Sequence, residues 1–398
     1  QFSYQSNGYR ENNDLKNNLY NLFAQVAATS DLSLQAEYRY RETTTGDLSS
    51  QFDGSFDHFV RRKIDQDVAR IGAHYSPSPQ TDIIASVIYT DRNTIVRYPN
   101  INFTAELDTN GYQAEAQLLH KADDFNFMVG LGGYALDVDT IGFNSLGRIE
   151  QKIAYGYTNI KWPEHLSWTV GLSYQSDDNP TLNRNELNPK LGVQWTINDY
   201  LSLRAAAFQA VKRTPLIEQT IEPTQVAGFN QFFDDAHMTL SKNYGLGLNV
   251  RFNNQLVGGL EAVRRDLEVP VGSQESQPFE IEQDQEDIYQ VFLYWLPNPR
   301  WAVTAAWRYE GFKLQEGQYL RQLFFQAPVE LKTTSIPLNI RYFDPSGFFA
   351  GLGVTYVNQD IRHLDQQSLA VLPTQSEDFV LVDAGLGYRL PKRWGIVA

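Results

Sequence analysis

The strongest constraint in this sequence is a strict alternation of apolar and polar residues that recurs in many separate segments. In residues 32–41, leucine, alanine and tyrosine occupy the even positions, while serine, glutamine, glutamate and arginine occupy the odd positions. The same alternation returns at 112–118, 166–175, 301–309 and 348–356. Because successive side chains of a strand point to opposite faces, each segment predicts a strand with one apolar and one polar face.

Short connections rich in turn-forming residues separate these segments, and longer connections alternate with them. The turns recur about every 45 residues, which leaves roughly 10 to 12 residues per strand, the length that a tilted strand needs to cross a bilayer. Nine such turns predict about eighteen strands. The nine turns are Ser30-Asp31, Ser76-Pro77-Ser78-Pro79, Ala122-Asp123-Asp124, Pro163-Glu164-His165, Asn198-Asp199, Asn253-Asn254, Pro297-Asn298-Pro299, Asp344-Pro345-Ser346-Gly347 and Lys392-Arg393.

Bulk composition excludes the other membrane architecture. Of the 398 residues, 42% are hydrophobic, but mean hydropathy is −0.41 and no stretch approaches the roughly 20 apolar residues of a membrane helix. No linker divides the chain, which indicates one continuous architecture. We therefore predict an all-β fold, a transmembrane antiparallel up-and-down β-barrel with short periplasmic turns and long extracellular loops. A soluble propeller is the alternative, but its strands are shorter and its connections do not alternate in length.

Tryptophan placement supports a membrane boundary at the turns. An indole ring prefers the headgroup level, and only Trp307 of the seven tryptophans lies away from a tight turn. We predict a membrane-interface girdle formed by Trp162, Trp168, Trp195, Trp295, Trp301 and Trp394.

The predicted location is the bacterial outer membrane, where the barrel contacts lipid and lipopolysaccharide. The connections near 42–60, 213–236, 266–287 and 360–377 are expected outside the cell because they are longer than the turns. The chain has no cysteine, in keeping with an oxidising compartment.

Neither end of the chain has the residue pattern of a complete strand. Residues 1–18 are polar and are expected to form a tether or a partial strand, and residues 19–398 are expected to form the barrel. The last residues, 394–398, stop within an apparent strand. We therefore expect the barrel to be incomplete at the C-terminus.

The polar faces of the strands, assigned to the lumen, lean positive. Arginine pairs with carboxylate or phosphate in a fixed fork, so a basic lumen predicts either a path for anionic solutes or internal Arg–Glu ladders that brace the wall. The basic set is Arg39, Arg41, Arg70, Lys152, Lys190, Arg204, Arg251, Arg308, Arg341 and Arg389, and the acidic set is Glu37, Glu115, Glu261, Glu310 and Asp383.

The acidic surplus, a formal charge of −14, is expected largely in the loops. An acidic extracellular loop at 266–287 contains no Lys or Arg among its acidic residues, and it either keeps the surface solvated, acts on charged solutes, or binds divalent cations together with lipopolysaccharide. Its members are Asp266, Glu268, Glu275, Glu280, Glu282, Asp284, Glu286 and Asp287.

Glycines occur as alternating pairs on the predicted lumen face. They are expected to bend the wall, and they also keep the bore open. The pairs are Gly130 and Gly132, Gly245 and Gly247, Gly351 and Gly353, and Gly385 and Gly387.

Nothing in the sequence predicts an enzyme. The six histidines show no metal-ligand spacing, and no serine lies in a nucleophile-elbow context. We expect no catalytic residue, no metal, no cofactor and no nucleic-acid partner.

Three stretches carry a family resemblance: FQAVKRTP at 208–215, EPTQVAGFNQFFDD at 222–235 and YGLGL at 244–248. They resemble the barrel that ends large tetratricopeptide-repeat outer-membrane proteins, and more weakly the barrels of TonB-dependent receptors. The closing YRLP at 388–391 fits the same group. The first resemblance implies export of exopolysaccharide with a periplasmic helical-repeat scaffold or secretion partner. The second implies energised uptake through a plugged barrel.

The favoured function at this stage is export or translocation of a polymer, such as a polysaccharide, through an aqueous lumen. A passive porin and a TonB-dependent receptor barrel are alternatives of the same class. A surface-display or adhesion protein that binds through its long loops is an alternative of another class.

Overall fold

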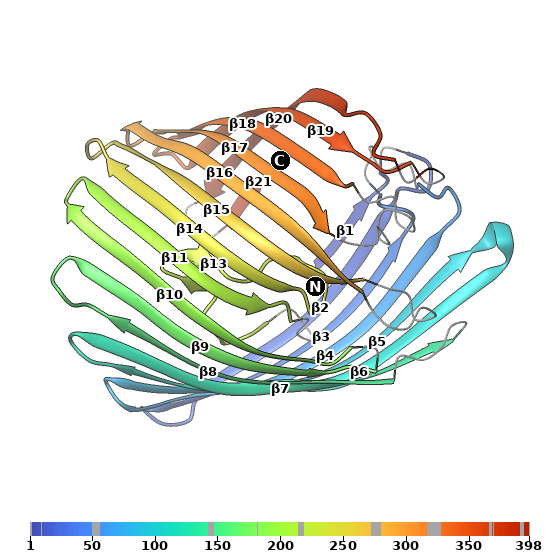
Figure 1. Ribbon diagram of the computed structural model, residues 1–398, viewed down its shortest axis with the longest axis horizontal. Coiled ribbons are helices and arrows are strands. Elements are labelled where there is room, and N and C mark those ends of the chain that lie inside the picture. Colours follow the sequence, from blue (N-terminus) through green and yellow to red (C-terminus); the bar gives the residue numbers. More distant parts are fainter. Residues whose placement is uncertain are drawn as a thin grey trace.

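A computed structural model describes most of the chain, and its strands form one antiparallel sheet wound into a barrel (Figure 1). Consecutive strands are neighbours throughout, except that β11 pairs with β14. The described residues are 2–8, 10–49, 56–141, 147–180, 182–213, 219–271, 280–316, 328–365, 368, 370–390 and 394–397.

This sheet has 19 strands in the described residues, against about eighteen expected. They are β1 (Phe2–Ser6), β2 (Leu15–Ala27), β3 (Leu32–Thr45), β4 (Arg61–Ser78), β5 (Thr81–Tyr98), β6 (Phe103–Lys121), β7 (Phe125–Ile141), β8 (Gly147–Ile160), β9 (Leu166–Asp178), β10 (Arg184–Asn198), β11 (Leu201–Val211), β14 (Leu240–Arg251), β15 (Leu256–Val271), β16 (Glu280–Asn298), β17 (Trp301–Glu316), β18 (Glu330–Phe343), β19 (Phe348–Arg362), β20 (Gln375–Leu390) and β21 (Trp394–Val397). Two further short strands, β12 (Gln225–Val226) and β13 (Phe229–Asn230), pair only with each other.

The all-β prediction is confirmed. One 3-10 turn, η1 (Pro99–Ile101), is the helical element of the described residues. No helix in that part of the chain has the length and hydropathy that a membrane-spanning helix needs.

The predicted turns join paired strands at one end of the barrel, which we call the turn end; the opposite end is the loop end. Eight of the turns lie wholly in the described residues, and the ninth, at residues 392–393, lies outside them. In the turn between β18 and β19, Asp344 accepts hydrogen bonds from the Ser346 backbone N–H and the Tyr342 hydroxyl, both at 2.9 Å. These bonds, led by those of Ser346, lower the pKa of Asp344 to about 2.

Apart from β1, β11 and β21, the strands of the barrel are 12 to 19 residues long, which exceeds the roughly 9 to 11 residues that a bilayer requires. The ladders therefore continue past the membrane at the loop end. This overrun corrects the prediction of an acidic loop at 266–287: residues 266–271 belong to β15 and residues 280–287 belong to β16. The alternation of acidic residues with Ile281, Gln283 and Gln285 is a strand pattern.

At the ends of the chain, short strands pair with their neighbours. β1 pairs with β2, which begins at Leu15, within the segment expected as a tether. β21 pairs with β20. Among the described residues, no ladder joins β1 to β20 or β21.

Apolar residues are exposed and polar residues are buried on this sheet, which is the reverse of the arrangement in a soluble protein. On β9, Leu172 and Tyr174 are 47% and 49% exposed, whereas Ser173 and Gln175 are 3% exposed. The apolar face points outward, where a membrane supplies lipid, and the polar face points into the lumen.

This geometry corrects one lumen assignment. On β8, the buried residues are Gln151, Ile153, Tyr155 and Tyr157, so the even positions point outward. The Lys152 side chain is 80% exposed and lies on the outward face. The alternation of β8 is weak in the sequence because tyrosine and isoleucine face the lumen.

We predict that arginine is costly on the outward face and tolerated on the inward face of the same strand. Leu338→Arg, at an outward position further from the turn end of β18, places a charge in hydrocarbon and should destabilise the protein by about 2–4 kcal/mol, whereas the adjacent inward Asn339→Arg should cost little. Urea titration of both variants folded into lipid vesicles measures the difference. Equal stability of the two variants would show that the two faces are assigned wrongly.

We also predict that the turn end lies in the periplasm. Because the chain has no cysteine, single cysteines at Ser346 in a turn and at Ser368 at the loop end can be labelled selectively. An impermeant maleimide should label Ser368→Cys on intact cells and should label Ser346→Cys only after lysis. The reverse result would invert the topology.

Candidate functional site

Residues 212–239 connect β11 to β14, and their described part, 212–213 and 219–239, folds into the barrel (Figure 1). We call this described part the lumenal segment. Its entry and exit are held together at the wall, because the Lys212 N–H donates to the Thr239 carbonyl at 2.8 Å. Within it, β12 and β13 form a small hairpin whose turn residues, Ala227 and Gly228, have φ of +47° and +86°. The expectation that residues 213–236 form an external loop is therefore wrong for the described part.

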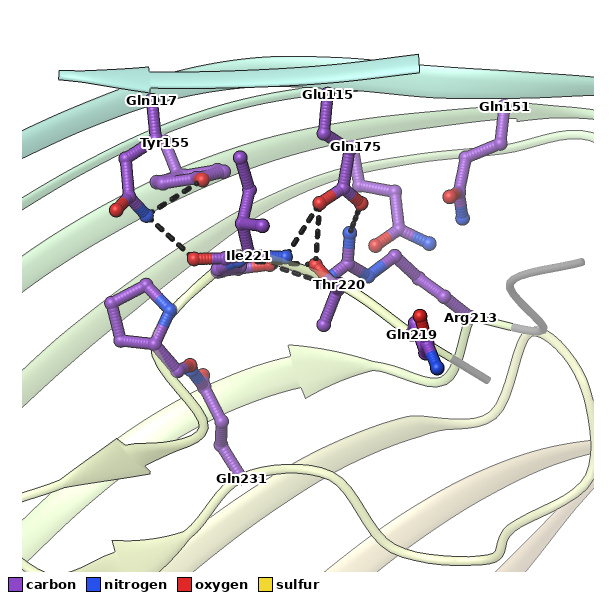
Figure 2. A network of polar contacts seen from close by, with 12 residues as sticks. Glu115, Gln117, Gln151, Tyr155, Gln175, Arg213, Gln219, Thr220, Ile221 and Gln231 are labelled. Atoms are coloured by element: carbon purple, nitrogen blue, oxygen red, sulfur yellow. Dashed lines mark hydrogen bonds and ion pairs between the residues drawn. The ribbon is translucent and has the colours of Figure 1, made fainter. Parts of the chain in front are cut away.

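Alternate inward residues of β6 hold one end of the lumenal segment (Figure 2). Gln113 Nε2 donates to the Gln219 carbonyl at 2.7 Å, and Gln117 Nε2 donates to the Ile221 carbonyl at 2.5 Å. Between them, Glu115 Oε2 accepts the Ile221 N–H at 2.6 Å. The two-residue period of the strand thus matches the backbone groups of the segment.

A buried ionic network anchors the same end. Arg213 contacts Glu222 at 2.5 Å and Glu115 at 3.8 Å, and the exposed fractions of the three side chains are 4%, 2% and 6%. The Tyr157 hydroxyl of β8 donates to Glu222 at 2.6 Å. Because buried charges are stable only when they are paired and hydrogen-bonded, removing the single guanidinium would leave two carboxylates uncompensated.

Two further arginines hold the other end of the segment. Arg204 of β11 donates to the Gly228 carbonyl at 2.8 Å, pairs with Glu261 of β15 and lies 4.6 Å from the ring centroid of Phe229. Arg265 of β15 is 2% exposed, and it pairs with Asp235 at 2.5 Å and lies 3.7 Å from the Phe233 ring. Each guanidinium therefore combines an ion pair with a cation–π contact.

Glycines of the wall make room for the hairpin. A Cβ built on Gly245 would lie 2.6 Å from the Phe229 ring, and one built on Gly192 would lie 2.5 Å from the Ala227 Cβ. The hairpin packs there in a small buried apolar cluster inside the barrel, formed by Ala206, Phe208, Val226, Ala227, Phe229 and Val263. At this site, wall glycine serves close packing against an inserted segment.

A cavity of about 830 Å³ lies between the lumenal segment and the inward faces of β3 to β6. Its lining includes Arg70, Gln113, Glu115, Lys212 and Phe232. The basic groups there have partners: Arg70 contacts Glu37 at 2.8 Å and donates to Gln219 at 2.7 Å. The cavity therefore offers polar hydrogen-bonding groups more than free charge.

The described residues show no metal-binding cluster. No group of three or more His, Cys, Asp or Glu side chains within them is placed to hold a metal ion.

The family model for TonB dependent receptor-like β-barrels matches residues 1–268. The chain belongs to this TonB-dependent receptor-like family. A comparison with curated proteins found no match.

Solved structures share the fold of this receptor-type barrel at low identity. They include the alcaligin outer-membrane receptor FauA from Bordetella pertussis (15% identity, 96% of this chain and 64% of that chain, TM-score 0.60). Two others are the copper transporter OprC (14%, 98% and 66%, TM-score 0.70) and P. aeruginosa FpvA in an iron–pyoverdine complex (11%, 99% and 61%, TM-score 0.71). The chain thus spans about two thirds of the length of these proteins.

These findings confirm the weaker of the two resemblances and place the chain in the outer membrane of Gram-negative bacteria. The matched proteins are receptors and transporters rather than enzymes. No comparison supports the resemblance to tetratricopeptide-repeat proteins.

The basic residues of the predicted lumen set, other than Lys152, lie on the inward face of the receptor barrel. Arg39 contacts Glu37 at 2.8 Å, Arg41 donates to Asn17 and Thr43, and Lys190, which is 3% exposed, donates to the Gln209 carbonyl at 3.0 Å. The ladders place four more arginines on the same face: Arg251, Arg308, Arg341 and Arg389.

The acidic residues of the hairpin β15–β16 divide between its two faces. Asp266 and Glu268 point outward and contact Arg264 and Lys242. Glu282, Asp284 and Glu286 point inward, and the first two are buried. Glu280 also points inward and Asp287 outward, while Glu275 lies outside the described residues.

The tryptophans lie near the turn end, as their positions in the sequence imply. Trp295 and Trp301 flank the turn between β16 and β17 and are 45% and 41% exposed. Trp168 and Trp195 lie on adjacent strands near their turns, and Trp162, in the connection between β8 and β9, is 72% exposed. Trp394 lies in β21, and its side chain is outside the described residues. Their role as a membrane girdle remains a prediction.

Sequence reasoning missed the lumenal segment. One sign of this segment in the sequence is that the long connection contains Val226, Phe229, Phe232 and Phe233. Apolar residues in a solvent-exposed loop would have no apolar surface to pack against. A second sign is that glycines occur on the inward face of the adjoining strands, where they leave space for an inserted segment.

We predict that Arg213→Met releases the lumenal segment from the wall. Because it removes the ion-pair partner that buried Glu115 and Glu222 share, it should lower the free energy that holds the segment by about 3–5 kcal/mol. Amide hydrogen exchange at residues 219–235 measures this as lost protection. Arg308→Met is the matched control: it removes the same charge from the inward face but touches no part of the network, so the protection should be retained. Unchanged protection in Arg213→Met would mean that the ionic network does not hold the segment.

Proposed function

We propose that this chain forms the membrane-spanning barrel of a receptor that imports a bulky polar ligand, a metal chelate, with energy supplied through TonB. The family match over residues 1–268 carries this proposal. The solved structures that share its fold include the siderophore receptor PirA, a receptor holding iron–pyoverdine and a copper transporter. These names point to metals and metal chelates as ligands, and we extend a metal chelate to this chain by analogy of fold.

The filled lumen supports a receptor over a passive porin. A porin needs a continuous aqueous path, but here residues 219–239 place a buried apolar cluster and a buried ionic network between β6 and β15. A ligand of several hundred cubic ångströms cannot pass that part of the bore unless the segment moves. Movement of this kind requires energy, which a TonB-coupled system provides.

Polymer export, the function that the sequence favoured, gains no support from the comparisons, and neither does a helical-repeat scaffold or secretion partner. The receptor alternative of that prediction is the one we adopt. Lipid and lipopolysaccharide remain the proposed partners of the outward face, on the strength of its exposed apolar residues.

The proposal predicts ligand uptake that depends on both the barrel and the energy source. In a strain that lacks the gene, accumulation of radiolabelled iron or copper from a panel of chelates should fall for at least one chelate, and the complete gene should restore it. Collapse of the proton gradient should abolish that difference. Uptake that continues unchanged after the gradient is collapsed would indicate a passive pore, and a panel without any difference would exclude metal chelates as the ligand.

A matched variant separates an effect on the uptake rate from an effect on the amount of protein in the membrane. Arg213→Met and Arg41→Met remove the same charge from the inward face, and Arg41 donates hydrogen bonds only to Asn17 and Thr43 among the described residues. Immunoblots of outer-membrane fractions report whether each variant is present. If the lumenal segment must be displaced in transport, Arg213→Met should alter the uptake rate at equal abundance.

A further inference from the structure

Two sets of inward arginines differ in their partners. Arg70, Arg204, Arg213 and Arg265 contact or belong to the lumenal segment, and each has a carboxylate partner: Glu37, Glu261, Glu222 and Asp235, respectively. These guanidinium groups are neutralised where they lie. They brace the segment and offer no open fork to a solute.

The second group lies on the wall formed by β17 to β20, which Figure 1 shows in orange to red. Arg308, Arg341 and Arg389 are exposed to the lumen. Within the described ranges, no carboxylate lies within ion-pair distance of any of the three. Their guanidinium forks are therefore open.

The ladders arrange these three arginines along the bore. Arg341 is level with Ala302 of β17 and, through Gly351 of β19, with Gly385 of β20. Arg308 lies six residues along β17 towards the loop end, roughly 20 Å away, and Arg389 lies four residues along β20 towards the turn end, roughly 13 Å away. Measured along the strand direction, the positive groups are thus spread over about 30 Å of the wall.

The wall beside Arg341 is hollow and unobstructed. A Cβ built on Gly385 would meet no atom within 4 Å, and one built on Gly351 would first meet Arg341 Cγ at 3.8 Å. A hollow of about 370 Å³ there is lined by Asn339, Arg341, Gly351 and Asp383, among others. Glycine at this wall leaves space open, whereas Gly245 accommodates Phe229.

We infer that the β17–β20 wall is an anion-binding face of the lumen, on which Arg308, Arg341 and Arg389 bind the carboxylate, phosphate or sulfate groups of a solute in transit. Guanidinium groups bind such oxyanions through two parallel hydrogen bonds. Three inward carboxylates, Glu310, Glu377 and Asp383, share the wall, so its formal charge is zero and binding is confined to the individual open guanidinium groups, with an affinity at each step that is low enough for release. The inference rests on the proposed function only in taking the lumen as the solute path.

The test measures local anion concentration in the lumen without any transport assay. A single cysteine in place of Thr304, on the inward face beside Arg341, carries a neutral fluorophore in the full chain folded in detergent micelles. Quenching by iodide is compared with quenching by neutral acrylamide at low ionic strength. The ratio of the two quenching constants reports anion enrichment, because acrylamide corrects for accessibility and also reveals any variant that has lost its fold.

Arg341→Gln should lower the iodide-to-acrylamide ratio about twofold, since one unit charge about 10 Å away in water changes the local concentration of a monovalent anion by about that factor. The triple change of Arg308, Arg341 and Arg389 to Gln should lower it further. Arg39→Gln is the matched control, because Arg39 is inward but paired with Glu37, and it should leave the ratio unchanged. Inorganic sulfate should protect the label from iodide in the parent and not in the triple variant.

Equal ratios in the parent, Arg341→Gln and Arg39→Gln would overturn the inference, as would sulfate protection that persists in the triple variant. Neither result depends on uptake. Failure of the chelate experiment with an intact iodide result would reject the proposed ligand and leave the anion-binding face standing.

Discussion

Backbone hydrogen bonding inside a bilayer is the constraint on which this structure depends. A peptide group in hydrocarbon has no water to bind, so each spanning strand must pair along both of its edges. The long antiparallel ladders satisfy this requirement and also fix every side chain to one of two faces. Lipid and lumen then select apolar and polar residues separately. Residues far apart in sequence, such as Arg204 and Glu261, meet because the ladders place both of them level with Gly247 on the inward face.

The second organising feature is a polypeptide segment that occupies the inside of its own barrel. A loop in water can expose its backbone, but residues 219–239 are enclosed, and their polar groups therefore need partners from the wall. Glutamine, glutamate and tyrosine on β6 and β8 supply these partners. Gly192 and Gly245 have no side chains, and they therefore leave the space that Ala227 and Phe229 fill. Wall and segment are thus complementary in both hydrogen bonding and shape.

The fold could be predicted from sequence to the level of strands, turns and faces, because period-two alternation is a local property. Turn chemistry marked nearly every hairpin for the same reason, as at Asp344. The overrun of β15 and β16 was not predictable from residue charge, since acidic residues are typical of both loops and solvated strand ends. The position of residues 212–239 could not be predicted either, because it depends on contacts with β6, β8 and β15, which are distant in sequence. For the candidate site, the arginines that the sequence assigned to the lumen do lie on the inward face. The sequence could not separate those neutralised by Glu37 or Glu261 from those left open, because ion pairing is a property of three-dimensional neighbours.

The entry and exit of the lumenal segment meet at the wall, and this arrangement affects how such a barrel can change in evolution. Because Lys212 and Thr239 already continue the β11–β14 ladder, the ladder does not depend on what lies between them. Insertions, deletions or replacements in that interval alter the shape of the bore while leaving the register of the wall intact. The barrel and its insert can therefore diversify separately, with the wall preserving membrane insertion and the insert adjusting what the bore admits.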